Sequence, residues 1–188
     1  AELAALLARI AGAPAPAAAR ELYPDVPSTH WAFSDIERMY ESGLMIGDAD
    51  GRFRPEDAVT RAELAMAAAR WLGLDPQADT NLPGMFPDVD GSHWASAAVN
   101  ALGRAGLFRG FEDGTFRPDA AVTRAQAVAV INRLTGRVPP SAGIAAAAAP
   151  WPDVPWDHWA FPDIAEATSS HAFMYGDDGY ETYGESAE

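Results

Sequence analysis

Two arginines stand where a chain of this kind could bind an anion. Residues 60–63 have the sequence Thr-Arg-Ala-Glu, and residues 123–126 have Thr-Arg-Ala-Gln. Each fits a capping box, in which the threonine caps a helix and the Glu or Gln three residues later bonds back to it. Arg61 and Arg124 then occupy the first helical position, where free backbone N–H groups and a guanidinium can together hold a carboxylate or phosphate. A cation there opposes the helix dipole at a cost of about 0.3–1 kcal/mol, so we expect either a bound anion or a neighbouring carboxylate to compensate it.

Three tryptophans, each preceded by a histidine, form the second group of candidate residues: Trp31, Trp94 and Trp159. Residue type alone favours a core position over a ligand-facing one. An indole beside an arginine, however, offers what a carbohydrate pocket needs, namely a flat apolar plate for sugar C–H groups and a fork for an acidic substituent. Both interpretations stay open at this point. A metal site built from the three histidines that precede these tryptophans is not expected, because each histidine lies at the start of a helix on a module that faces outward.

These residues recur because the chain is built from repeats. The sequence YPDVPSTHWAF at 23–33 returns as FPDVDGSHWAS at 86–96 and as WPDVPWDHWAF at 151–161, at spacings of 63 and 65 residues. Behind the first two copies, GDADGRFRPEDAVTRAE at 47–63 returns as GFEDGTFRPDAAVTRAQ at 110–126. A period of this length with two helical patterns predicts a helix-loop-helix module that buries its apolar face against its neighbours.

Each module is predicted to hold two helices. The first ends near Gly43 in copy one and near Gly106 in copy two, as C-cap glycines would require. The second runs over about 61–72 and 124–135. In the third copy, Pro162 favours a helix that begins at the proline itself.

The first twelve residues supply a further second helix. AELAALLARIAG at 1–12 aligns without gaps with AELAMAAARWLG at 62–73. The chain therefore holds three second helices and three first halves, and we infer a mainly α fold with a pseudo-threefold, three-pronged arrangement of tandem repeats.

The repeats and the Pro/Ala-rich stretches between them divide the chain. The predicted parts are the second helix of a truncated repeat (1–12), a linker (13–22), a repeat (23–73), a linker (74–85), a repeat (86–136), a linker (137–150) and a divergent C-terminal half-repeat (151–188). This last part has nine acidic residues and no arginine, so it should repel an acidic ligand.

The Asp-Gly segments of the first two copies are predicted to be turns. Asp48-Ala49-Asp50-Gly51 suggests a calcium loop, but the glycine comes too early and Val59 cannot supply the closing carboxylate. The requirement shared with copy two is a positive φ at Gly51 and Gly114, and the pattern extends it to Gly179.

Composition excludes several classes of function. A net charge of −14 without a basic stripe argues against nucleic-acid binding, and the apolar stretches are too short or too interrupted to insert in a membrane. No paired carboxylates, nucleophile elbow, phosphate loop or metal motif is found, so neither catalysis nor a cofactor is expected.

Taken together, the motifs resemble the S-layer homology (SLH) family, whose repeats carry an aromatic-x-D-V segment, H-W-A, a helix-ending glycine, G-x-x-D-G-x-F-x-P and TRAE. The resemblance covers nearly the whole chain. It implies a three-module spindle around a central helical bundle, with grooves between modules that bind cell-wall polysaccharide. In several members this glycan is acidic and carries pyruvate ketals.

The resemblance also implies which residues bind the glycan. Matched motif by motif, they are Arg61, Arg124, Trp31, Trp94, Trp159, Gly47, Gly51, Gly110 and Gly114. Two departures from the family pattern favour two working grooves over three: the arginine expected before Ala1 is absent, and the third copy has GYETYGESAE in place of the F-R-P loop.

Two functions follow from the sequence. The first is an extracellular anchor that holds a larger secreted protein on the secondary cell-wall polysaccharide of a bacterial cell wall or S-layer. The alternative is a self-assembly module whose partners are neighbouring surface-layer or filament subunits, which the alanine-rich linkers and acidic tail would suit.

Overall fold

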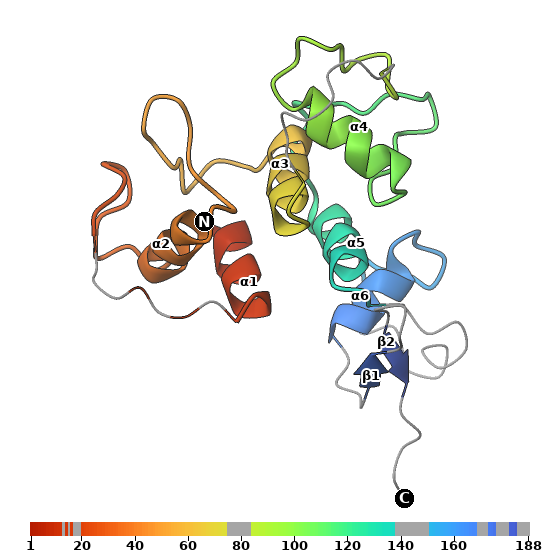
Figure 1. Ribbon diagram of the computed structural model, residues 1–188. Coiled ribbons are helices and arrows are strands. Elements are labelled where there is room, and N and C mark those ends of the chain that lie inside the picture. Colours follow the sequence, from red (N-terminus) through yellow and green to blue (C-terminus); the bar gives the residue numbers. More distant parts are fainter. Residues whose placement is uncertain are drawn as a thin grey trace, which may run out of the picture. The chain divides into compact units, whose positions relative to one another are not determined.

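A computed structural model describes residues 1–12, 14, 16, 20–74, 84–137 and 151–168, and the backbone of two strands near the C-terminus. The elements in this part of the chain are mostly helical, which confirms that the fold is mainly α (Figure 1). In order they are α1 (Glu2–Ile10), α2 (Phe33–Glu41), α3 (Arg61–Trp71), α4 (Ser96–Arg104), α5 (Arg124–Leu134), α6 (Phe161–Thr168), β1 (Phe173–Tyr175) and β2 (Glu181–Tyr183). The two strands pair antiparallel in a hairpin that the sequence patterns did not predict.

The described chain forms two compact units. The first comprises residues 1–102 and 110–121, and the second comprises 103–109 and 122–188. The second repeat is thus divided, with its F-R-P segment in the first unit and α5 in the second. Most residues of the three predicted linkers lie outside the described part of the chain.

The helix boundaries follow from local capping. Both α3 and α5 begin at the predicted arginine, and each shows both hydrogen bonds of the capping box. Gly43 and Gly106 follow α2 and α4 with φ of 71° and 72°, as their C-cap role requires. The predicted start of α6 is wrong by one residue: it begins at Phe161, because a proline at the second position also gives up an N–H that has no intrahelical partner.

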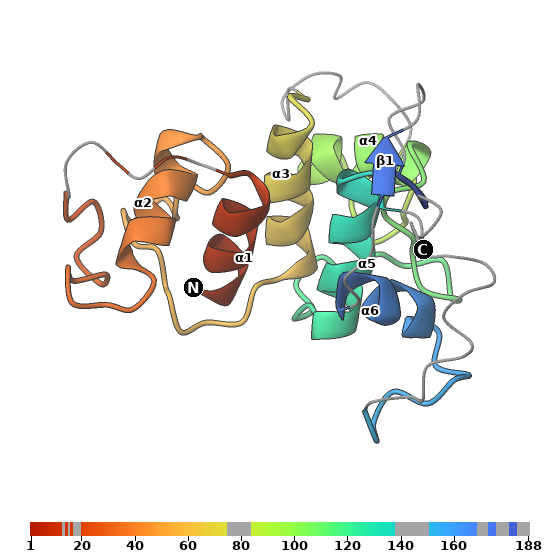
Figure 2. The same ribbon diagram turned by 90° about the horizontal axis from the view of Figure 1, so that it is seen from below.

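A pair of helices organises each unit. In the first, α1 packs beside α2, as Figures 1 and 2 both show, with Leu7 of α1 and Ile36 and Met39 of α2 almost completely buried. In the second, α5 packs beside α6, and the Asn132 side chain donates a 2.9 Å hydrogen bond to the Asp163 carbonyl. In copies one and three, the first-half helix therefore packs on the second helix that precedes it in sequence.

An aspartate holds each F-R-P loop, a name we give to residues 47–59 (loop 1) and 110–121 (loop 2). In loop 1, Phe53 N donates to Asp25 Oδ1 at 3.1 Å and Arg54 N donates to Asp25 Oδ2 at 2.7 Å. In loop 2 the equivalent N–H groups donate to Asp88 at 2.8 and 2.6 Å. Both bonds reach back 28 or 29 residues, so the Asp of each P-D-V motif fixes the loop of its own module.

We call the pair of hydrogen bonds from a loop to its aspartate the clamp. The second N–H group in each clamp belongs to an arginine with unusual backbone geometry. Arg54 and Arg117 have φ of 54° and 58°, in the left-handed region that non-glycine residues seldom occupy. This conformation turns both backbone N–H groups of the loop toward one carboxylate. The charged hydrogen bonds offset the backbone strain.

Glycines let each loop approach the aromatic residue that opens the module. A Cβ atom on Gly47 would lie 2.6 Å from Tyr23 Cε1, and one on Gly110 would lie 2.8 Å from Phe86 Cε1. Gly51 and Gly114 adopt the predicted positive φ, at 71° and 80°. The corresponding prediction for Gly179 lies outside the described residues.

We predict that Gly47→Ala destabilises the fold more than Gly51→Ala. Both substitutions force alanine into the left-handed region, at about 1–2 kcal/mol. Only the first also drives a methyl group into Tyr23 and to 2.7 Å from the Arg52 carbonyl oxygen, which should add about 1–3 kcal/mol. Urea unfolding of the two variants measures the difference, and equal losses would show that the close approach is not a constraint.

Candidate ligand-binding site

Arg61 lies inside a junction between consecutive repeats. Its side chain is only 6% exposed, and Nε donates a 2.6 Å hydrogen bond to the Phe116 carbonyl of loop 2. The guanidinium also stacks on two rings, 4.5 Å from the centroid of Phe116 and 4.8 Å from that of Phe111. Desolvation by this burial lowers the pKa of Arg61, an effect that Asp88 opposes and Arg117 reinforces.

The backbone at the start of α3 is occupied by the same loop. Arg61 N donates to the Ala120 carbonyl and Ala62 N to the Pro118 carbonyl, each at 2.9 Å. Glu63 N donates to the Thr60 hydroxyl, and Thr60 N donates to Glu63 Oε2. All four N–H groups that a helix start leaves without intrahelical partners are therefore satisfied by protein, and none is left for an anion.

The same loop-to-helix contact occurs one repeat earlier. The amino group of Ala1 donates a 2.7 Å hydrogen bond to the Pro55 carbonyl of loop 1. Ala1 aligns with Ala62 and Pro55 aligns with Pro118, so the two contacts are equivalent. The sequence patterns did not predict this role of the prolines, although both prolines stand at the same distance before a Thr-Arg-Ala segment.

Arg124, by contrast, is exposed at the start of α5. Among the described residues, no group pairs with its guanidinium or with the backbone N–H groups of Arg124 and Ala125. The following N–H, that of Gln126, is capped by Thr123 Oγ1 at 3.2 Å. The Arg124 guanidinium and two backbone N–H groups thus lie together at the start of a helix, and this arrangement can bind a carboxylate or phosphate.

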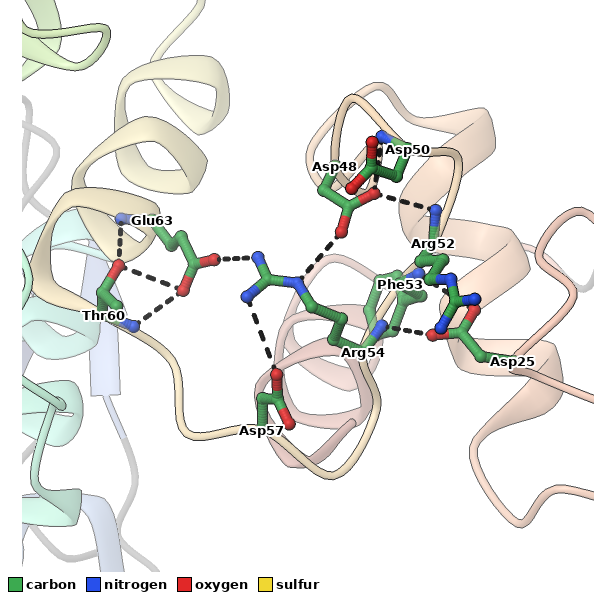
Figure 3. Close-up of polar contacts among 9 residues, drawn as sticks. All are labelled: Asp25, Asp48, Asp50, Arg52, Phe53, Arg54, Asp57, Thr60 and Glu63. Carbon is green, nitrogen blue, oxygen red and sulfur yellow. Dashed lines mark hydrogen bonds and ion pairs between the residues drawn. The ribbon is translucent and has the colours of Figure 1, made fainter.

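Loop 1 presents the opposite electrostatic character (Figure 3). Arg54 forms ion pairs with Glu63 at 2.8 Å, Asp48 at 3.1 Å and Asp57 at 3.7 Å. Burial would lower the pKa of Arg54, but these three carboxylates raise it above its ordinary value. Arg54 is therefore neutralised by its neighbours.

A surface depression of about 700 Å³ adjoins this ionic cluster. Carboxylates outnumber guanidinium groups in its lining, which makes it a poor site for an acidic glycan. The lining residues are Asp25, Asp48, Asp50, Arg52, Arg54, Pro55, Glu56 and Asp57.

The three predicted tryptophans are exposed, so the expectation of burial from residue type alone is wrong for all of them. Trp31, Trp94 and Trp159 are 62%, 54% and 59% exposed. Each indole packs against the histidine before it, with ring centroids 5.6–5.8 Å apart; the rings are stacked in the first two copies and tilted in the third. We call these segments the H-W turns (residues 27–33, 90–96 and 155–161).

The alanine after each tryptophan takes the core position instead. Ala32, Ala95 and Ala160 are completely buried. The backbone N–H of each donates to Nδ1 of the histidine two residues earlier at 3.1–3.2 Å. The histidines therefore shape the turns, and no cluster of metal-ligand side chains is found in the described part of the chain.

The residues that the family resemblance implied thus fall into distinct environments. Arg61 lies in the repeat junction, and Gly47 and Gly110 allow an aromatic ring to pack closely. Gly51 and Gly114 shape exposed turns. The implied residues whose side chains can reach a ligand from the surface are Arg124, Trp31, Trp94 and Trp159.

Comparisons with known proteins agree with the motifs. The S-layer homology domain family matches residues 22–65 and 86–128. The chain is 34% identical over 187 residues to a cellulosome-anchoring protein of Acetivibrio thermocellus, an alignment that covers 96% of this chain and 40% of that protein. It is 33% identical over 119 residues to an S-layer protein of Bacillus licheniformis, covering 63% and 13%.

An enzyme is also among the similar proteins. The chain is 32% identical over 111 residues to an endoglucanase of Bacillus sp. strain KSM-635, covering 59% of this chain and 11% of the enzyme. The chain therefore spans less than half the length of each of these relatives. Among the helices that the structure describes, none has the length and apolar character needed to span a bilayer.

The clamp aspartates predict how stability depends on pH. Burial would raise the pKa of Asp88, but the N–H groups of Phe116 and Arg117 outweigh it and leave the pKa below its usual value. A carboxyl with a lowered folded-state pKa stabilises the fold above its unfolded value, about 4, and loses that contribution as pH falls through the folded value. Asp88→Asn keeps one acceptor oxygen, so we expect it to lower the free energy of unfolding by about 1–3 kcal/mol at pH 7.

Urea unfolding between pH 7 and pH 3 checks this. The difference in free energy of unfolding between wild type and Asp88→Asn should narrow below about pH 4, because the unfolded chain then binds a proton at Asp88 that the folded chain binds only at lower pH. Asp119→Asn, which changes an exposed carboxylate of the same loop, serves as the matched control. If the difference in free energy of unfolding between wild type and Asp88→Asn stays constant down to pH 3, the charge of Asp88 does not stabilise the fold.

The two TRA arginines should differ in their effect on stability. Arg61→Ala removes a buried hydrogen bond and two ring contacts, so we expect a loss of about 2–4 kcal/mol. Arg124→Ala changes an exposed side chain and should cost no more than about 0.5 kcal/mol. Urea unfolding at pH 7 measures both, and similar losses would contradict the different environments of the two residues.

Proposed function

This chain is a member of the S-layer homology family of cell-surface domains, and on that premise we propose that it anchors a larger protein by binding acidic cell-wall polysaccharide. The anchoring is non-covalent, takes place outside the cell at the bacterial surface and uses no cofactor. The observation that carries the proposal is the exposed start of α5. There the Arg124 guanidinium and two backbone N–H groups can hold the carboxylate of a pyruvate ketal or a similar acidic substituent.

The H-W turns complete the proposed glycan contacts. Trp31, Trp94 and Trp159 each offer an indole held by the histidine beneath it, so little side-chain entropy is lost when a sugar ring stacks on it. A planar apolar face contacts sugar C–H groups, whereas the arginine selects the acidic group. Together they would give both affinity and preference for an acidic glycan.

The remaining residues implied by the family have supporting roles in this proposal. Arg61 holds loop 2 against the start of α3, and Gly47 and Gly110 let each loop close on its module. Gly51 and Gly114 shape the exposed tips of the loops. None of these contacts needs a ligand to form.

A pseudo-threefold arrangement around a central helical bundle is part of the same proposal. Three second helices, α1, α3 and α5, alternate with three H-W halves along the chain. The hydrogen bonds of Ala1 with Pro55 and of Ala62 with Pro118 are equivalent. Successive repeats are therefore joined by the same type of contact at two junctions, which supports a symmetric arrangement.

We propose no catalytic role for this chain. The endoglucanase relative is matched over only 11% of its length, so its activity is not assigned to this chain. Asp48 and Asp57 of loop 1 form ion pairs with Arg54, and Asp48 also accepts two backbone N–H groups of the loop, so these carboxylates have structural partners.

A self-assembly module of a surface lattice or filament is the second candidate. Leu6 and Ile10 lie one turn apart on α1 and are both exposed, which is a feature of helices that contact a partner. Neighbouring subunits of the surface layer would then cover this strip. The two candidates differ in whether glycan is needed for retention at the surface.

Arg124→Ala should weaken retention on purified cell-wall sacculi by about tenfold, because a charge-assisted pair to a carboxylate is lost. Sedimentation of the sacculi with bound protein measures retention. Arg9→Ala, which removes an exposed arginine from the last turn of α1, is the matched control and should bind as wild type.

Light scattering on the same preparations separates the two candidates. A chain that stays monomeric at high concentration and loses retention with Arg124→Ala fits the glycan anchor. Unchanged retention by Arg124→Ala, together with assembly in the absence of glycan, would reject the anchor in favour of the assembly module.

A further inference from the structure

The third H-W turn carries a second exposed tryptophan that the other two lack. Trp156 occupies the position of Ser28 in copy one and Gly91 in copy two. It is 48% exposed, and Trp159, three residues later on the same turn, is also exposed. Two large indoles therefore lie on one short segment that carries neither Lys nor Arg.

Both indoles are fixed by the turn that bears them. His158 N donates to the Pro155 carbonyl at 2.9 Å, and Phe161 N donates to the His158 carbonyl at 2.8 Å. The Trp156 ring packs against Phe161 with centroids 4.6 Å apart, and Trp159 lies 5.7 Å from the His158 ring. The pair is held in place before any ligand arrives, which reduces the entropy lost on binding.

The fold does not require the additional indole. Phe33, which corresponds to Phe161, is 7% exposed in a turn that has Ser28 at the equivalent position, and Phe161 itself is 6% exposed. Trp156 thus leaves about half of a large apolar side chain in water without burying its neighbour further. Exposed aromatic surface of this kind is typical of a binding site.

We propose that Trp156 and Trp159 form an aromatic platform that binds the sugar rings of an uncharged stretch of polysaccharide. Indole faces contact the C–H face of a hexose, and sugar hydroxyl groups can donate to nearby carboxylates. The neighbouring Asp153, Asp157 and Asp163 supply such acceptors, and without a cation on the segment they repel an anionic ligand. The charge of the turn therefore selects a neutral glycan, in contrast to the acidic group expected at Arg124.

This inference rests on the proposed function only in taking the ligand to be a cell-wall polysaccharide. Trp159 contributes to both proposals, whereas Trp156 belongs only to the platform and Arg124 only to the acidic-glycan site, so substitutions of Trp156 and Arg124 test the two proposals separately. In this view the third copy contributes its own type of glycan contact, in place of the acidic-glycan site expected for a complete repeat.

Affinity electrophoresis of the full chain tests the platform. The probe is soluble wall polysaccharide from which mild acid has removed the ketal and phosphate groups, compared with the untreated polymer. Trp156→Ser, which installs the residue of copy one, should weaken binding to the treated polymer about tenfold. Met85→Ala, which removes an exposed apolar side chain outside the three H-W turns, is the control and should bind the treated polymer as wild type does.

The outcomes separate the two proposals. Arg124→Ala should reduce binding to the untreated polymer and leave binding to the treated polymer unchanged. The platform is rejected if wild type does not bind the treated polymer, if Trp156→Ser binds it as wild type does, or if only a polypeptide or a lipid vesicle binds in a Trp156-dependent way. Circular dichroism spectra that match wild type establish that Trp156→Ser is folded.

Discussion

The clamp between one aspartate carboxylate and two backbone N–H groups supports the rest of each complete module. Asp25 and Asp88 bind loops 28 and 29 residues away and hold an arginine of each loop in the left-handed region. With the loop fixed in this way, its proline carbonyl accepts a hydrogen bond from the helix start of the preceding repeat. A local polar interaction therefore determines how one repeat joins the next.

This junction explains why two arginines with the same local sequence have different roles. Loop 2 covers the start of α3 and encloses Arg61, whose charge is balanced by a carbonyl oxygen and two aromatic rings. In the described part of the chain, nothing equivalent pairs with the start of α5, and Arg124 is exposed. The anchoring chemistry that we propose depends on this difference.

The three H-W turns share one set of hydrogen bonds, which we call the frame, but differ in their exposed residues. In all three, a histidine accepts the N–H of a buried alanine and supports an exposed indole. Only the third adds Trp156 within an acidic segment, whereas the first two have a small residue there. The frame is preserved because it depends on backbone hydrogen bonds, and the exposed positions are free to vary because they do not.

Sequence by itself determined the features that depend on neighbouring residues. It gave the repeats, the starts of α3 and α5, both capping boxes and the left-handed Gly51 and Gly114, because each follows from hydrogen bonds or steric limits within a few residues. Only the tertiary structure decided that Arg61 is buried, that Arg124 is open and that the tryptophans face solvent. Burial depends on which distant loop packs over a residue. Two identical Thr-Arg-Ala segments do not specify whether such a loop covers the arginine.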